Sequence, residues 1–214
     1  MNKGFVVEIG RACLLDVPNI NTDIIIPQTE LATISRSGLG EGLFACWRYL
    51  EGRTEDPQFA LNRGRNRQSR FLITANNFGC GSSREHAVWA LEDFGIRAVV
   101  SPSFGEIFRA NCVRNGILPA VVAEGDYTQL ADLARNTEDG MDISIDLRCR
   151  WICAGELRVE FQIDPGDWHR LLNGIDEIKE TLAHLGAIET FSRGEGTRLT
   201  WLHWTPWASS NSTR

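Results

Sequence analysis

Residues 76–87 of the chain are Asn-Asn-Phe-Gly-Cys-Gly-Ser-Ser-Arg-Glu-His-Ala, and this stretch decides the fold. An apolar run, 71–75, precedes it, and a segment with helical periodicity follows it. The pattern predicts a strand, a glycine turn and the start of a helix. Gly79 and Gly81 allow the backbone to turn tightly and to come close to a ligand.

The start of this helix is suited to binding a small anion. Ser82 and Glu85 have the S-x-x-E spacing of a capping box. Backbone N–H groups at a helix N-terminus attract negative charge, because they are unpaired and lie at the positive end of the helix dipole. Arg84 can hold a carboxylate through two hydrogen bonds. We call residues 79–84 the cradle; Ser82 and Ser83 add two hydroxyls to it.

The spacing of the cradle excludes several better-known sites. A dinucleotide fingerprint needs glycine at the position that Arg84 occupies when counting from Gly79, and the G-K-[ST] of a P-loop is absent. The stretch also lacks the G-x-S-x-G of a nucleophile elbow. An ordinary capped helix after a glycine turn would have a similar outline, so the outline alone is weak evidence of a site.

The centre of the chain predicts a βαβαβ unit. We expect strands and helices to alternate over 70–75, 83–94, 96–101, 103–115 and 117–123. Such a unit implies a parallel sheet, and ligands bind at the carboxyl ends of its strands. The cradle follows the first of these strands, so it lies at that edge.

The flanking segments are less regular. Residues 28–52 indicate a long loop with short helices, and the arginine-rich connector 62–70 is either a solvated loop or a contact for an acidic partner. We expect a strand over 5–15, a helix over 126–136, a strand over 142–147, a hairpin over 150–163, and helices over 165–173 and 176–191. The predicted domains are therefore residues 1–191 and a Trp-rich tail, 192–214.

Net charge, hydrophobic patterning and cysteine spacing exclude several classes of function. A net charge of −6 argues against nucleic acid as the main partner. The sequence has neither an apolar run of the ~20 residues that span a membrane nor a signal peptide, so we expect a cytoplasmic location. The six cysteines include no C-x-x-C, and the four histidines are scattered. We therefore expect no metal or iron–sulfur site on this chain.

Several stretches, in order, carry a resemblance to a known family. They are Asn19-Ile20-Asn21-Thr22-Asp23-Ile24-Ile25-Ile26-Pro27, Ser35-Arg36-Ser37-Gly38, Ser82-Ser83-Arg84-Glu85, Ser101-Pro102-Ser103-Phe104-Gly105-Glu106-Ile107-Phe108 and Leu172-Asn173-Gly174-Ile175-Asp176. Together they resemble the 3-isopropylmalate dehydratase small-subunit family of the aconitase superfamily, from about Gly10 to Phe191. Asn21 departs from the family pattern, which usually has Asp there. The resemblance implies an α/β fold, a swivelling β/β/α domain with a βαβαβ core and a mixed sheet.

The resemblance also implies a function. The chain would be the small subunit of a hydro-lyase that interconverts 2-isopropylmalate and 3-isopropylmalate in leucine biosynthesis. Ser82 would be the base, Ser83 and Arg84 would hold a substrate carboxylate, and Asp23 would be a supporting hydrogen-bond partner. The family's loop around Arg36 helps select the substrate side chain. A [4Fe–4S] cluster would lie on a separate large subunit, in a heterodimer or a higher hetero-oligomer.

The residues themselves leave alternatives open. Asp23 is as well explained as a capping residue in a turn, and surface exposure is the commoner fate of an arginine such as Arg36. The same cradle would serve a paralogous dehydratase that acts on another alkylmalate. A non-catalytic RNA-binding regulator is a third possibility, against which the acidic balance and the intact Ser82-Ser83-Arg84 argue.

Overall fold

The computed structural model describes residues 4–31, 37–81, 84–137, 140–175 and 181–195. Its strands are β1 (Val7–Leu15), β2 (Phe71–Thr74), β3 (Ala98–Ser101), β4 (Leu118–Val122), β5 (Met141–Asp146), β6 (Trp151–Ala154) and β7 (Leu157–Gln162). Its α-helices are α1 (Thr22–Ile25), α2 (Ala45–Arg48), α3 (Glu85–Phe94), α4 (Glu106–Arg114), α5 (Glu124–Arg135), α6 (Pro165–Asn173) and α8 (Leu185–Glu195). Short 3-10 helices are η1 (Gln28–Glu30), η2 (Leu39–Gly42), η3 (Glu51–Arg53), η4 (Ala60–Asn62) and η5 (Gly64–Gln68).

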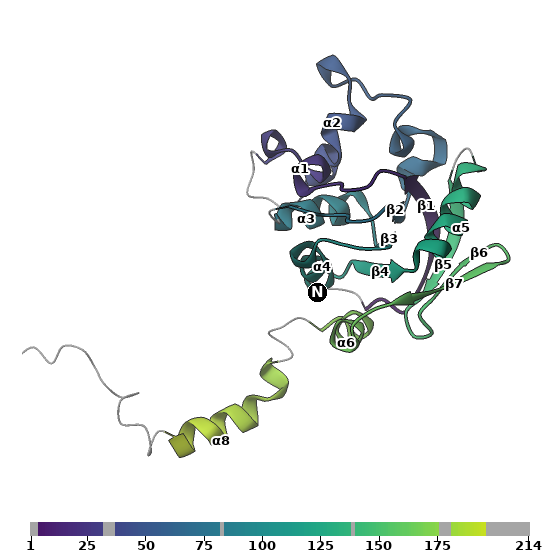
Figure 1. Cartoon of the computed structure of the whole chain (residues 1–214). Coiled ribbons are helices and arrows are strands. Elements are labelled where there is room, and N and C mark those ends of the chain that lie inside the picture. The colour runs from purple at the N-terminus through teal and green to yellow at the C-terminus, as the bar shows by residue number, and fades with distance from the viewer. Residues whose placement is uncertain (1–3, 32–36, 82–83, 138–139, 176–180, 196–214) are drawn as a thin grey trace, which may run out of the picture. The chain divides into compact units, whose positions relative to one another are not determined.

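The strands form a mixed sheet that closes into a barrel in the order β1-β2-β3-β4-β7-β6-β5 (Figure 1). The first four are parallel neighbours, and β2, β3 and β4 among them are the strands of the predicted βαβαβ unit. The last three are antiparallel, and β7 pairs with β4 while β5 pairs with β1. The α/β class, the βαβαβ core and the mixed sheet are therefore confirmed.

Arg11 supports the closure of the barrel. It is 8% exposed, and its guanidinium donates to the Gly140 carbonyl at 2.7 Å and pairs with Asp142 at 3.1 Å. A buried guanidinium needs partners of this kind, since an unpaired charge away from water is costly. The contact joins segments more than 120 residues apart, directly at the β1–β5 seam.

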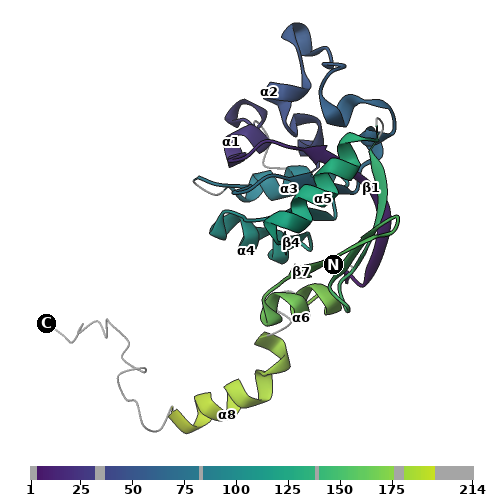
Figure 2. The ribbon, with the colours of Figure 1, turned by 45° about the vertical axis from the view of Figure 1, so that its right-hand side comes forward.

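Two apolar clusters cover the two faces of the parallel strands. Leu72 and Val99 face the cluster made with α3 and α4, whereas their neighbours Ile73 and Val100 face the barrel interior and α5. Successive strand residues point to opposite faces, and both faces are buried, which explains the continuous apolar runs of these strands. Figures 1 and 2 show α3 and α4 on one side of the strands and α5 on the other.

The described residues of the connection from β1 to β2 form a series of short helices, as the sequence predicted for residues 28–52. Of these, η2 packs on α3, whereas η4 and η5 lie against β1. The arginine-rich connector is largely paired within the chain: Arg67 pairs with Glu55 at 2.5 Å, and Arg70 pairs with Glu8. These contacts favour its interpretation as an ordinary surface loop over a contact for an acidic partner.

The chain divides into two compact units, Met1–Ile175 and Asp176–Arg214. The first contains the whole barrel. In the second, α8 exposes the apolar side chains of Leu185, Ile188 and Phe191. The predicted division at residues 191 and 192 stays a prediction, and the Trp-rich stretch from residue 196 onward lies outside the described residues. In the described part of the chain, no helix has the length and apolarity that crossing a membrane requires.

Candidate active site

Two turns at the carboxyl edge of the parallel strands are joined by backbone hydrogen bonds. In the turn after β1, the Asn19 N–H donates to the Asn76 carbonyl at 2.9 Å. In return, the Gly79 N–H donates to the Ile20 carbonyl at 2.7 Å. These bonds place the first motif of the chain beside the cradle, although some 60 residues separate them. The carboxyl ends of neighbouring parallel strands share one edge, so β1 and β2 bring both turns there.

The turn after β3 completes this edge. Phe78 N–H donates to the Ser103 carbonyl at 3.1 Å, and Gly105 N–H donates to the Phe78 carbonyl at 2.9 Å. Gly79 and Gly81 have φ of +72° and +88°, a region that side chains disfavour. A Cβ on Gly79 would also overlap the Phe108 ring. The predicted tight glycine turn is confirmed.

The predicted capping box is wrong. Helix α3 begins at Glu85, so its N-cap is Arg84, whose side chain makes no capping hydrogen bond. Glu85 is therefore one residue into the helix, too early for the capping-box carboxylate. Its Oε1 instead accepts from Asn115 Nδ2 at 3.2 Å, and Asn115 Oδ1 accepts from Trp89 at 3.2 Å. The S-x-x-E pattern predicted that the helix begins at residue 83, but α3 begins two residues later. The pattern alone cannot distinguish these two starts.

Arg84 lies next to Asp23. Its Nη1 is 2.7 Å from Asp23 Oδ1, and the side chains are 31% and 61% exposed. This distance makes an ion pair, so Asp23 orients the guanidinium. A guanidinium has five N–H donors, so one carboxylate oxygen uses only part of its capacity. The remaining donors can serve an anion at the start of α3.

Asn21 takes the N-cap of α1. Its Oδ1 accepts from the Ile24 N–H at 2.9 Å, and the negative charge of Asp23 falls in the first turn, where the helix dipole favours it. Asp and Asn cap helices about equally well. Having Asn at position 21, where the family usually has Asp, therefore leaves this turn intact. Asp23 itself is not the cap, so the capping interpretation of Asp23 is wrong.

The structure brings together four of the seven predicted site residues: Asp23, Gly79, Gly81 and Arg84. Ser82, Ser83 and Arg36 lie outside the described residues, so their proposed roles stay predictions. The sequence did not point to the side chain of Asn115 at the start of α3. No local pattern marks it, because its partners are 26 and 30 residues away.

The cysteines and histidines of the described region do not gather into a metal site. Within it, no group of three or more His, Cys, Asp or Glu side chains is arranged to hold a metal ion. Burial raises the pKa of the Cys13 thiol to about 12 and also raises that of Cys112, so both stay protonated. His86 packs edge-on against Trp89, with ring centroids 4.7 Å apart.

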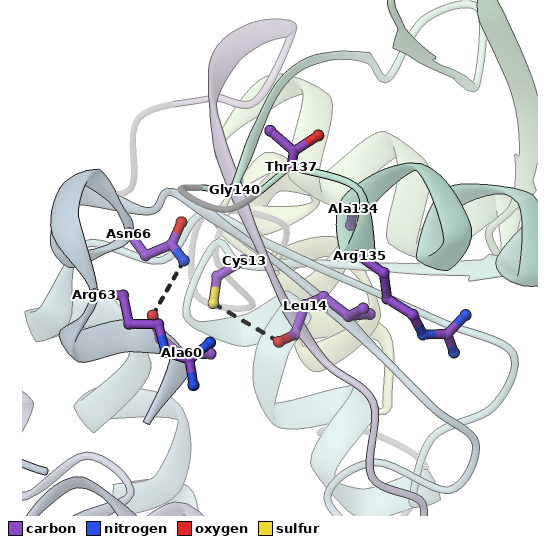
Figure 3. A pocket seen from close by; sticks show the side chains of 9 residues that line it. All are labelled: Cys13, Leu14, Ala60, Arg63, Asn66, Ala134, Arg135, Thr137 and Gly140. Atoms are coloured by element: carbon purple, nitrogen blue, oxygen red, sulfur yellow. Dashed lines mark hydrogen bonds between the residues drawn. The ribbon is translucent and has the colours of Figure 1, made fainter. Parts of the chain in front are cut away.

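A separate pocket of about 590 Å³ lies between β1, the η4–η5 connector and the end of α5 (Figure 3). Most of its polar side chains are engaged by the chain itself, although Asn66 Oδ1 is buried without a hydrogen-bond partner among the described residues. The Cys13 thiol is held protonated, the Arg135 guanidinium is engaged by Asp16 and Asp132, and Asn66 Nδ2 donates to the Ala60 carbonyl at 3.1 Å. None of its lining residues belongs to the cradle. The cradle edge is therefore the better candidate for an active site.

Comparison with known proteins agrees with this geometry. Residues 2–125 match the family described as the aconitase C-terminal domain, which places the chain in the aconitase class. The chain is 48% identical over 198 residues to the 3-isopropylmalate dehydratase small subunit of Sinorhizobium fredii, covering 92% of this chain and 98% of that one. The corresponding subunit of Agrobacterium fabrum is 47% identical over 193 residues, covering 90% and 96%. The chain belongs to the family of 3-isopropylmalate dehydratase small subunits.

A solved structure supports the same fold. The crystal structure of 3-isopropylmalate dehydratase from Methanocaldococcus jannaschii is similar with a TM-score of 0.63 at 25% identity. The similarity covers 87% of this chain and 99% of that chain. The sequence resemblance is therefore confirmed, along with the aconitase-type domain that it implied.

Proposed function

We propose that this chain is the small subunit of a dehydratase that interconverts 2-isopropylmalate and 3-isopropylmalate by removing and re-adding water. The observation that carries the proposal is the Arg84 guanidinium, which its ion pair with Asp23 orients at the N-terminus of α3. A dicarboxylate substrate supplies acceptors for its remaining N–H donors. The identity of the substrate, isopropylmalate, is inferred from the names of the relatives.

The cradle residues have distinct roles in this proposal. Arg84 binds a substrate carboxylate and keeps it next to the first N–H groups of α3, with Ser83 as a further contact. Ser82 removes the proton from the carbon beside that carboxylate. A serine hydroxyl is a poor base, so Ser82 would act as its alkoxide, which the positive charge of Arg84 and of the helix N-terminus stabilises. Asp23 holds the guanidinium in place through their ion pair.

The other half of the chemistry is the departure of hydroxide from the neighbouring carbon, which a Lewis acid assists. The aconitase family is iron–sulfur based. We assign that role to a [4Fe–4S] cluster on the large subunit, the partner that the name small subunit implies. When bound, the cluster supplies Lewis acidity. This chain supplies the base and the carboxylate site, which makes the carboxyl edge of the barrel the face that meets the partner.

The test is reconstitution with the candidate large subunit under anaerobic conditions, followed by a panel of alkylmalates. We expect turnover of 2-isopropylmalate and 3-isopropylmalate in preference to methyl- or unsubstituted malates. Preference for another alkylmalate would assign the chain to a paralogous dehydratase. Absence of turnover with every substrate, in an assembled and iron-loaded complex, would contradict the proposal.

A further inference from the structure

The pocket between β1, the η4–η5 connector and α5 contains a buried acceptor that the chain does not satisfy. Asn66 is 5% exposed, and its Nδ2 donates to the Ala60 carbonyl at 3.1 Å, which turns Oδ1 to the Gly140 side of the pocket (Figure 3). This Oδ1 has no hydrogen-bond partner among the described residues. Buried acceptors are normally paired, because leaving one unpaired is costly. The atom therefore needs a donor from outside the described chain.

The amide of Asn66 is held in one orientation. Gly140 has φ of +72°, and a Cβ there would lie 2.1 Å from Asn66 Oδ1, so only glycine lets the amide come this close. The Gly140 carbonyl accepts from Arg11 Nη1 at 2.7 Å, which fixes the peptide behind the amide. Since Nδ2 is bonded to Ala60 on the other side, Oδ1 is a fixed acceptor at the floor of the pocket.

The mouth of the pocket is positively charged. Arg63 and Arg135 line it and are exposed, and Arg135 is engaged by Asp16 and Asp132. Arg63 donates to the Gln58 carbonyl but has no acidic partner among the described residues. A guanidinium of this kind can take a carboxylate through two hydrogen bonds.

Arg63 and Asn66 are spaced to serve one ligand. The Asn66 N–H donates to the Arg63 carbonyl at 2.9 Å, which closes one 3-10 turn at the start of η5. Side chains three residues apart lie above one another in such a turn, so both line the same pocket. Between the cation and the acceptor, Leu14, Ala60 and Ala134 supply apolar walls.

We propose that this pocket binds a small carboxylic acid that carries a hydroxyl or ammonium group beside its carboxylate. The carboxylate pairs with Arg63, the hydroxyl or ammonium donates to Asn66 Oδ1, and a short aliphatic side chain packs on the apolar walls. The volume of about 590 Å³ lies within the range of small-molecule sites. The site is separate from the cradle, because none of its lining residues belongs to residues 79–84.

The first test is an NMR titration of the full chain with four matched probes. α-Hydroxyisovalerate and L-valine carry both groups, whereas isovalerate lacks the donor and isobutylamine lacks the carboxylate. We expect one of the first two to bind with a Kd of about 1 mM and to shift the Leu14 and Gly140 amides. The tighter of the two identifies the donor as hydroxyl or ammonium. Isovalerate and isobutylamine are expected to bind at least tenfold more weakly.

Three outcomes of this titration would overturn the proposal. They are no binding of either two-group probe at 20 times the expected Kd, binding of isovalerate as tight as that of α-hydroxyisovalerate and L-valine, and shifts confined to the Gly79 and Gly81 amides. The second outcome would leave Asn66 Oδ1 without a role, and the third would place the ligand in the cradle.

The second test uses variants of the two contact residues. Arg63→Gln is expected to weaken binding at least tenfold, whereas Arg65→Gln, the same change at an exposed arginine outside the pocket, should stay within twofold of wild type. Asn66→Leu removes the acceptor and is expected to abolish the preference for two-group probes, with thermal melting as the check on folding. If Asn66→Leu does not fold, Arg63→Gln still decides: unchanged binding in that variant would exclude the pocket as the site.

Discussion

At the scale of single residues, Arg84 combines two roles that usually exclude each other. Its ion pair with Asp23 orients the guanidinium, yet the other N–H donors of the guanidinium keep capacity for an anion. A fully satisfied arginine would have little to offer a substrate. We therefore propose the pair as an oriented site for an anion, and substitutions at either residue separate orientation from charge.

Arg84→Lys tests whether the planar guanidinium matters. Lysine keeps the charge but loses the two-pronged donor. We expect kcat/KM of the reconstituted enzyme to fall at least tenfold, or about 1.4 kcal/mol, with KM raised and kcat lowered together. If lysine left both parameters within about twofold of wild type, Arg84 would be a structural residue and the anion site would be wrong.

Ser82→Ala tests the assignment of the base. Loss of the hydroxyl is expected to lower kcat by ~10²–10⁴-fold, the range that general-base catalysis contributes. Because Arg84 is the N-cap of α3, we expect no loss of helix capping and a melting temperature close to wild type. Near-normal kcat in a folded and assembled variant would exclude Ser82 as the base. Ser83→Ala serves as the matched control, with KM affected more than kcat.

At the scale of elements, the cradle is held by close backbone packing among three turns. Gly79 lies against the ring of Phe108 at the start of α4, and Phe78 packs edge-on against the same ring, with centroids 5.3 Å apart. The position of α4 therefore sets the path of the cradle turn. The turn after β1 is held differently, by hydrogen bonds from Tyr127 and Arg135 of α5 to Asp16.

Gly79→Ala is expected to destabilise the fold by about 3 kcal/mol. Part of the loss comes from positive φ, and the rest from overlap of the new methyl with Phe108. Gly155→Ala is the control: its φ is also positive, at +58°, but a Cβ there meets open space, so a loss of about 1 kcal/mol is expected. Equal losses in urea unfolding would show that the Phe108 contact contributes nothing.

The link between β1 and α5 predicts a pH dependence. Asp16, just after β1, accepts hydrogen bonds from Tyr127 and Arg135, and these lower its carboxyl pKa below the usual value. A lowered folded-state pKa stabilises the protein above the unfolded-state pKa of about 3.9 and loses that contribution as pH falls through the folded-state value.

The comparison is between wild type and Asp16→Asn in urea. We expect wild type to be more stable at pH 6, with the difference shrinking below about pH 4 as Asp16 is protonated. Tyr127→Phe removes the larger cause of the shift and should weaken the pH dependence. A stability difference that stayed constant from pH 6 to pH 3 would contradict the interpretation.

At the scale of the whole molecule, the barrel presents the cradle at one edge, and the described residues hold no cluster of metal ligands there. Family membership as a small subunit implies a partner chain. In the proposed function, the carboxylate-binding groups lie on this chain and the Lewis acid lies on that partner.

The purified chain alone is accordingly expected to bind no iron and to show no dehydratase activity. Anaerobic purification with assays of iron, acid-labile sulfide and turnover measures both. Adding the iron-loaded large subunit to the wild-type chain should restore activity. Adding the same subunit to the Arg84→Lys variant should restore much less activity. A stoichiometric cluster or substantial turnover in the isolated chain would overturn the division between subunits.

The sequence alone determined the parts that depend on local chemistry. The apolar runs, the helical periodicities and the glycines at 79 and 81 predicted the βαβαβ unit and the place of the cradle, because side-chain periodicity and positive φ are properties of short segments. Only the tertiary structure decided the closure of the barrel by pairing of β5 with β1, the N-cap at Arg84, and the hydrogen bonds from the Gly38 and Gly40 N–H groups to Asp93. Each of these depends on contacts between segments far apart in the chain, whose geometry is set by the packing of the whole core.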